Sequence, residues 1–137
     1  MYTYETKIRV RYAETDQMGV VYHSNYFQYF EVVRAESIRS MGITYADMEQ
    51  MGIIMPVVEV KCKYMKPALY DDLLTIKLIL NHLPTDHKIT FHNEVLNEKN
   101  ELLAIGHVVL YFMEAKTMKK TKMPENLYHK LELYFVQ

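Results

Sequence analysis

Residues 25–42 read NYFQYFEVVRAESIRSMG, and this stretch decides the fold. Its apolar side chains follow one another without a strand-length interruption, and its charged side chains recur at helical spacing. We predict a helix that starts near Asn25, with Gln28 as a capping partner, and ends near Gly42, where glycine can adopt the left-handed conformation of a helix C-terminus. Because this helix is apolar around most of its circumference, we expect it to be buried.

The segments around this helix predict strands and two short helices. Apolar side chains recur at every second position, or in a continuous run, in residues 4–12, 58–64, 74–80, 89–95 and 102–113. One short helix is expected between Thr44, with Asp47 as its capping partner, and Gly52, and another after Pro124. This order predicts an α+β fold, a five-stranded antiparallel sheet wrapped around the long central helix, with the last three strands in a meander.

Length and composition restrict the possible classes of protein. A chain of 137 residues is expected to form a single domain, residues 1–137. Sixteen basic and 17 acidic side chains leave a formal charge of −1, which excludes a bulk electrostatic attraction to nucleic acid or to an anionic membrane. One cysteine excludes an internal disulfide, and the longest apolar run, residues 108–113, is too short to span a bilayer. We therefore expect a cytoplasmic protein with no nucleic-acid partner and no membrane span.

A second informative motif lies just before the long helix. Residues 16–26 read DQMGVVYHSNY, preceded by RVRY at residues 9–12 and followed by Phe30 and Glu31 in the helix. This pattern resembles the active-site segment of the hotdog-fold acyl-CoA thioesterases, the branch that includes 4-hydroxybenzoyl-CoA thioesterase. The resemblance implies a homodimer or homotetramer with active sites between subunits. It also implies an acyl-CoA substrate, with acyl carrier protein as an alternative carrier, and no cofactor, because coenzyme A enters as part of the substrate.

Thioester hydrolysis needs an attacking oxygen and a donor for the tetrahedral oxyanion, but no strong acid, because a thiolate is a good leaving group. Asp16, in a loop after a strand, is the candidate for the attack, either as a nucleophile that forms an anhydride or as a base toward water. Gly19 allows a tight backbone path beside it. His23 lies at the entrance to the helix, where unpaired N–H groups converge, and the resemblance implies that its N–H is the oxyanion donor.

Further residues are candidates for substrate binding. The resemblance implies that the His23 side chain orients substrate or water, and Tyr22 and Asn25 are expected to line the same pocket. Tyr26 is another lining candidate, with a position in the core or a subunit interface as the alternative. Glu31 is a candidate second acid facing the pocket, with an ion pair on the helix surface as the alternative. A metal site is not expected, because no second histidine or cysteine lies near His23 in the sequence.

The phosphate groups of coenzyme A need local positive charge. Lys61, Lys63 and Lys66 are the candidates, at and after the end of one predicted strand, although an exposed strand face explains these lysines equally well. Cys62 has the apolar phase of the same strand, so it is expected to be a small buried side chain and not the nucleophile.

Two other functions remain open from the sequence. A hotdog-fold hydratase or dehydratase of acyl thioesters usually pairs a histidine with an acid on the central helix, whereas Asp16 precedes that helix. A non-catalytic acyl-CoA-binding module would need the pocket but not Asp16. Thioester hydrolysis is therefore the predicted activity.

Overall fold

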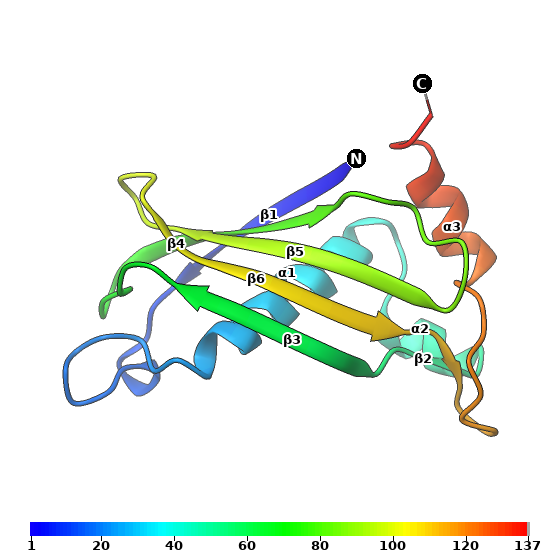
Figure 1. The fold of residues 1–137 in the computed structure, drawn as a ribbon, viewed down its shortest axis with the longest axis horizontal. Coiled ribbons are helices and arrows are strands. Elements are labelled where there is room, and N and C mark those ends of the chain that lie inside the picture. Colours follow the sequence, from blue (N-terminus) through cyan, green and yellow to red (C-terminus); the bar gives the residue numbers. More distant parts are fainter. Residues whose placement is uncertain (137) are drawn as a thin grey trace.

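In the computed structural model, which describes residues 1–136, one long helix packs against a five-stranded antiparallel sheet (Figure 1). The helices are α1 (Asn25–Ser40), α2 (Tyr45–Gln50) and α3 (Glu125–Glu132). The sheet has the order β1-β4-β5-β6-β3, and its strands are β1 (Tyr2–Arg9), β3 (Val57–Tyr64), β4 (Leu73–Leu80), β5 (Lys88–Leu96) and β6 (Leu102–Tyr111). The predicted α+β fold, with five antiparallel strands and a β4-β5-β6 meander, is confirmed.

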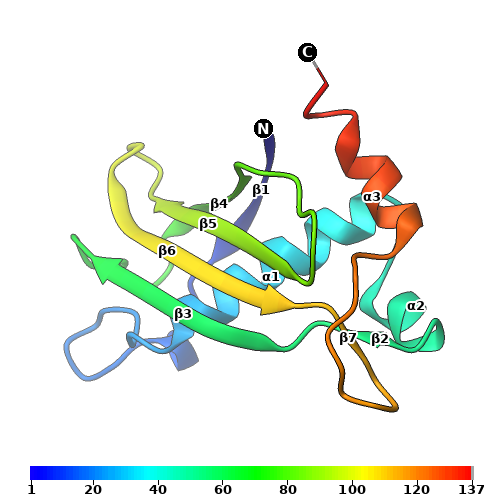
Figure 2. The same ribbon diagram turned by 45° about the vertical axis from the view of Figure 1, so that its right-hand side comes forward.

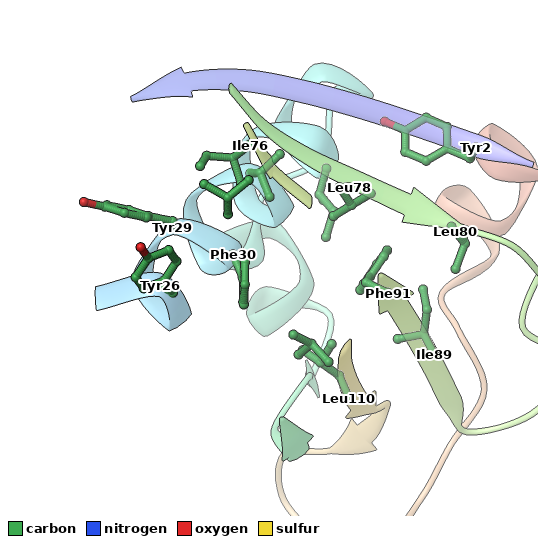
Figure 3. Close-up of a cluster of buried hydrophobic side chains, with 14 of the residues drawn as sticks. Tyr2, Tyr26, Tyr29, Phe30, Ile76, Leu78, Leu80, Ile89, Phe91 and Leu110 are labelled. Carbon is green, nitrogen blue, oxygen red and sulfur yellow. The ribbon is translucent and has the colours of Figure 1, made fainter. Parts of the chain in front are cut away.

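The inner face of the sheet forms the core. Every second side chain of β4 is fully buried, and the matching positions of β5 lie beside them at Ile89, Phe91 and Val95. Figure 3 shows the labelled side chains of β4 and β5 on the same side of the sheet as Phe30 of α1. A strand projects alternate residues to opposite faces, so the period of two in the sequence identified this face correctly.

Helix α1 buries one face only, so in one chain the expectation that it is buried and not laid on a surface is wrong. Tyr26, Phe30 and Val33 are buried, whereas Phe27 and Val32 are 38% and 41% exposed. Helix α1 packs chiefly against β1 and β4, and a single sheet covers only one side of a helix. The predicted capping role of Asn25 is also wrong, because Ser24 is the N-cap residue and Asn25 is the first residue of the helix.

Strand β3 is the second departure from the sequence prediction. Seven of its eight residues are exposed and Cys62 is only partly buried, so the expected buried face is absent from this strand. The reason is its place at the edge of the sheet, where it pairs with β6 alone and lies away from the strands that carry α1 (Figure 1).

The first strand also ends earlier than predicted. β1 stops at Arg9, and the chain then turns through a 3-10 helix, Tyr12–Glu14, in which Tyr12 is 78% exposed. The predicted capping of α2 by Thr44 and Asp47 is confirmed.

The short elements gather at one end of the molecule. A pair of two-residue strands, β2 (Ile53–Ile54) and β7 (Met113–Glu114), was not predicted, and it lies close to α2 (Figure 2). The loop that precedes α1 lies at the opposite end (Figure 2). None of the helices in residues 1–136 has the length and apolar character needed to cross a membrane.

Candidate active site

The loop between β1 and α1 is a tight, internally bonded turn. The N–H of Asp16 donates to the carbonyl of Val20 at 2.9 Å, and the carbonyl of Asp16 accepts from the N–H of Gly19 at 3.0 Å. Gly19 has φ +78°, the left-handed region that glycine adopts without strain. The loop is attached to the rest of the fold through Val21, whose N–H donates to the carbonyl of Ala68 at 2.8 Å. The prediction that Gly19 permits a tight path at Asp16 is confirmed.

The two carboxylate oxygens of Asp16 have different surroundings. Its Oδ1 accepts from the backbone N–H of Met18 at 2.8 Å and from that of Val20 at 3.4 Å. Within residues 1–136, no hydrogen bond involves Oδ2. The half-buried side chain is therefore held in one orientation with one oxygen available to a substrate or a water molecule.

Asp16 lines an open groove of about 350 Å³, which we call the Asp16 groove. Four residues predicted from the sequence meet there: Asp16, His23, Tyr26 and Lys66. The other lining residues are Met18, Val20, Val21, Tyr64, Met65 and Pro67. The groove thus joins the loop before α1 to the end of β3.

His23 is fixed at the entrance of α1 by its carbonyl group. That oxygen accepts from the hydroxyl of Tyr64 at 2.9 Å, and the His23 ring lies 4.3 Å from the ring of Tyr22, centroid to centroid. Burial raises the pKa of Tyr64 to about 12, so this hydroxyl stays protonated and remains a donor at neutral pH. The backbone N–H of His23 takes part in none of the hydrogen bonds formed by residues 1–136, which leaves it available for an oxyanion.

Tyr22 and Asn25 lie beside the groove and do not line it. Tyr22 is 47% exposed and contacts His23. The side-chain amide of Asn25 donates to the carbonyl of Glu14 at 2.8 Å, so Asn25 anchors the loop to the helix.

The other predicted binding residues lie farther away. Glu31 lines a separate pocket with Arg34, not the Asp16 groove. Lys61 pairs with Glu59 at 3.5 Å, and neither Lys61 nor Lys63 lines the groove of its own chain. Lys66 does line it and also contacts Glu101 at 2.7 Å, and this hydrogen bond lowers the pKa of the Glu101 carboxyl.

Glu14, which was not predicted from the sequence, fixes the loop between β1 and α1 through its hydrogen bonds. Its buried carboxylate accepts from the N–H of Arg11 at 2.8 Å, from the guanidinium of Arg11 at 3.2 Å and from the hydroxyl of Tyr29 at 3.1 Å. Its carbonyl accepts from the N–H of Tyr22 at 2.9 Å and from Asn25. Burial and this carboxylate together raise the pKa of Tyr29, which keeps the Tyr29 hydroxyl a donor. The three-residue spacing of Arg11 and Glu14 was the available signal.

The second pocket has a volume of about 440 Å³, and we call it the Arg34 pocket. Its polar lining consists of Glu31, Arg34, Tyr45 and Glu49, and its apolar lining of Met48, Ile53, Ile54, Met55, Pro56 and Val57. Within residues 1–136, no three histidine, cysteine, aspartate or glutamate side chains converge where a metal ion could bind.

The fold and the motif at Asp16 are those of a hotdog-fold family, and comparison with known proteins shows which family it is. The chain belongs to the thioesterase-like superfamily, whose family model matches residues 10–131. A solved structure of DHNA-CoA thioesterase from Staphylococcus aureus is 34% identical, covers 98% of this chain and 94% of its own, and superimposes with a TM-score of 0.88.

Two curated relatives are similar over different lengths. Acyl-CoA thioester hydrolase YbgC of Escherichia coli is 27% identical over 120 residues, which are 88% of this chain and 89% of that protein. A relative from Bacillus subtilis is 45% identical over 76 residues, and this segment spans 56% of this chain and only 55% of that relative.

Proposed function

We propose that this protein hydrolyses acyl-CoA thioesters to a carboxylic acid and free coenzyme A. The observation that carries the proposal is the Asp16 carboxylate, held through Oδ1 while Oδ2 has no hydrogen bond within residues 1–136, in the same groove as His23. The names of the Escherichia coli and Staphylococcus aureus relatives, an acyl-CoA thioester hydrolase and a DHNA-CoA thioesterase, support the same reaction.

Asp16 can act in either of two ways in this geometry. As a base, it takes a proton from water while the water oxygen bonds to the thioester carbon, and the C–S bond then breaks to release the thiolate. As a nucleophile, its carboxylate oxygen bonds to that carbon, the thiolate leaves, and water hydrolyses the resulting anhydride. In both routes the carbonyl oxygen becomes negatively charged in the tetrahedral intermediate, and the N–H of His23 is the donor that stabilises it.

Substrate binding extends from this reacting centre. We assign Lys66, at the wall of the Asp16 groove, to the phosphate groups of coenzyme A, together with Lys61 and Lys63 on β3. The His23 imidazole, with the Tyr22 ring tilted beside it, orients the thioester or the water. Coenzyme A arrives as part of the substrate, so no separate cofactor is needed, and acyl carrier protein remains an alternative carrier. The cytoplasmic location and the single-domain organisation also stay predictions.

A second copy of the chain is expected to pair with the free edge of β3. The exposed residues of β3 include Val57, Val58 and Val60, which are 48%, 46% and 39% exposed. Both edge strands carry exposed charged side chains, but the exposed residues of the opposite edge strand, β1, include no apolar one: they are Thr3, Glu5, Lys7 and Arg9. We therefore propose a dimer whose two sheets join at β3, and a tetramer would be a pair of such dimers.

A hydratase or dehydratase is the second candidate, and the positions of the acidic residues argue against it. Such enzymes usually pair the histidine with an acid on the central helix. In one chain neither acid of α1 lines the groove that contains His23, because Glu31 lines the Arg34 pocket and Glu36 pairs with Arg39. The acid that shares the groove with His23 is Asp16, which precedes the helix. A non-catalytic binding module would not need the Asp16 carboxylate to be held in a fixed orientation.

The test is a hydrolysis assay on short, long and aromatic acyl-CoAs, in which a thiol reagent reports free coenzyme A. Asp16→Asn keeps an oxygen for the N–H of Met18 but removes the charge, so turnover should fall by more than about 100-fold. The matched control is Asp71→Asn, the same change at an exposed aspartate with φ 68°, a conformation that asparagine tolerates. Turnover of Asp16→Asn within a few-fold of wild type would contradict the mechanism.

A further inference from the structure

Arg34 is a buried charge in the middle of α1. It is only 7% exposed, and its single side-chain hydrogen bond within residues 1–136 runs from Nε to the hydroxyl oxygen of Tyr45 at 2.9 Å. No carboxylate of these residues lies within 4 Å of the guanidinium. Its terminal nitrogens are not among the fully buried unpaired atoms of residues 1–136, so they reach the space of the pocket that Arg34 lines. An acceptor oxygen of a ligand could replace the water that solvates them there.

The Arg34 pocket presents hydrogen-bond donors on an apolar wall. Because the oxygen of Tyr45 accepts from Arg34, its own proton is free to donate, and burial raises the pKa of Tyr45 so that the proton is retained. Both residues line the pocket, opposite apolar side chains such as Ile53 and Met55. Glu31 and Glu49 also line it, but both are exposed. The pocket therefore suits an apolar group that carries an acceptor oxygen.

Within one chain, this pocket is far from the reacting centre. Val57, at the start of β3, lines the Arg34 pocket, and Tyr64, at its end, lines the Asp16 groove. Seven steps along a strand span about 23 Å. Figure 1 shows the same separation, with α2 and β2 at one end of the molecule and the loop before α1 at the other. A short acyl group at Asp16 cannot reach the Arg34 pocket of its own chain.

Pairing of two β3 edges removes this separation. Two copies of one strand that continue a sheet across a two-fold axis must run antiparallel. The Val57 end of one β3 then lies beside the Tyr64 end of the other. The Arg34 pocket of one copy thereby adjoins the Asp16 groove of the second copy.

We propose that Arg34 and Tyr45 of one copy bind an oxygen at the far end of the acyl group whose thioester is hydrolysed at Asp16 of the other copy. The substrate class is thus an acyl group with a hydroxyl, keto or carboxylate oxygen distant from the thioester. This inference rests on the proposed thioesterase activity and on the β3 dimer. It makes Arg34 and Tyr45 specificity-determining residues.

The first experiment compares matched substrates. The kcat/KM values of acyl-CoAs with six, eight and ten carbons are measured for the plain chain, for the chain with a terminal hydroxyl and for the chain with a terminal carboxylate. The wild type should prefer an oxygenated chain over the plain one by about tenfold or more at one length or several, and the hydroxyl and carboxylate arms decide which oxygen is bound. Equal kcat/KM values for the oxygenated and plain chains at every length would overturn the proposal.

Two variants assign the preference to the pocket. Arg34→Met and Tyr45→Phe should each bring the ratio of kcat/KM for the oxygenated substrate to kcat/KM for the plain substrate closer to one. The matched control is Arg39→Met on the same helix, where Arg39 is exposed and paired with Glu36, and this variant should keep the wild-type ratio. If Arg34→Met does not fold, Tyr45→Phe alone decides, and a wild-type ratio in that variant would overturn the proposal.

The second experiment tests which copy supplies the pocket. Asp16→Asn and Arg34→Met chains carrying different tags are co-expressed, and mixed dimers are purified. If the pocket serves the other copy, one site of a mixed dimer has both wild-type residues, and about half of the wild-type activity on the oxygenated substrate returns. If the pocket serves its own chain, both sites stay defective, which would overturn the proposal.

A wild type that hydrolyses no acyl-CoA at all would instead contradict the proposed function. The two failures are therefore distinguishable, because the specificity proposal is judged only on ratios and on mixed dimers of an active enzyme.

Discussion

The structural role of Asp16 and its proposed chemical role fall on different carboxylate oxygens. Oδ1 closes the turn with the N–H of Met18, and we assign the proposed chemistry to Oδ2, which has no hydrogen bond within residues 1–136. A substitution that removes both oxygens would therefore disturb the loop and the chemistry together. Asparagine keeps the first acceptor, which is why it separates loss of charge from loss of structure.

Gly19 and His23 allow the oxyanion donor to be tested apart from Asp16. If the donor is the N–H of His23, His23→Ala should keep measurable activity, because the substitution leaves that N–H in place. Gly19→Val places a branched side chain at φ +78°, so the loop must shift, and turnover should fall as far as in Asp16→Asn.

Turnover and circular dichroism are measured for both variants, so that misfolding is recognised. An active Gly19→Val together with an inactive His23→Ala would mean that the imidazole, and not the backbone N–H, is the essential group.

Glu14 should contribute to stability as well as to turnover. Its carboxylate accepts three hydrogen bonds in a buried setting, and glutamine would turn an N–H donor toward Arg11 or Tyr29. We expect Glu14→Gln to lower the free energy of unfolding by about 1–3 kcal/mol and to lower turnover, because the loop that holds Tyr22 and Asn25 loosens.

Urea denaturation and the thiol assay measure the two effects. Glu5→Gln, at an exposed position of β1, is the matched control and should change neither. A Glu14→Gln variant with wild-type stability would show that the carboxylate does not hold the loop.

The candidate site residues that could be proposed from the sequence are those placed by their neighbours in the chain. Asp16, Gly19 and His23 lie within one loop, and their spacing carries the signal. Glu14 and Arg34 depend on side chains 15 and 11 residues away, Tyr29 and Tyr45, and the sequence contains no pattern that joins those pairs.

At the scale of the elements, Gly106 of β6 lies close to Phe30 of α1. A Cβ atom there would lie 2.5 Å from the ring of Phe30, nearer than two carbon atoms can pack. We expect Gly106→Ala to lower the free energy of unfolding by about 1–3 kcal/mol, as overpacking of a core does.

A double-mutant cycle identifies the cause of that loss. If the clash with Phe30 is responsible, Gly106→Ala should cost less in a Phe30→Leu background, where the ring is absent. Thermal or urea unfolding of the four proteins gives the coupling energy, and purely additive losses would exclude the contact as the cause.

The elements themselves were predictable where burial alternates with a period of two or follows a capping residue. The inner face of β4 and the start of α2 at Thr44 are of this kind. The exposed faces of β3 and α1 were not predictable, because alternation reveals which side chains share a face but not whether a neighbouring element covers that face. The two-residue strands β2 and β7 are too short to produce any pattern.

At the scale of the whole molecule, the proposed dimer would account for exposed apolar residues on both β3 and α1. The valines of β3, together with Phe27 and Val32 of α1, are exposed in one copy and would be candidates for contact with a second copy. The same dimer would also bring the two kinds of pocket together.

Charge on the β3 edge should therefore separate the copies. In the double variant Val58→Lys and Val60→Lys, the new lysines of one copy would lie opposite the end of the other β3 that carries Lys61 and Lys63, and like charges opposite one another destabilise strand pairing. We expect light scattering at micromolar concentration to give a monomer, with a large loss of kcat/KM because each Asp16 groove lacks its neighbour. Thr3→Lys, an exposed residue on β1 at the other edge, is the control and should leave assembly and activity as in the wild type. A wild type that is already monomeric and fully active would refute the dimer, and a lysine variant that stays dimeric would exclude β3 as its interface.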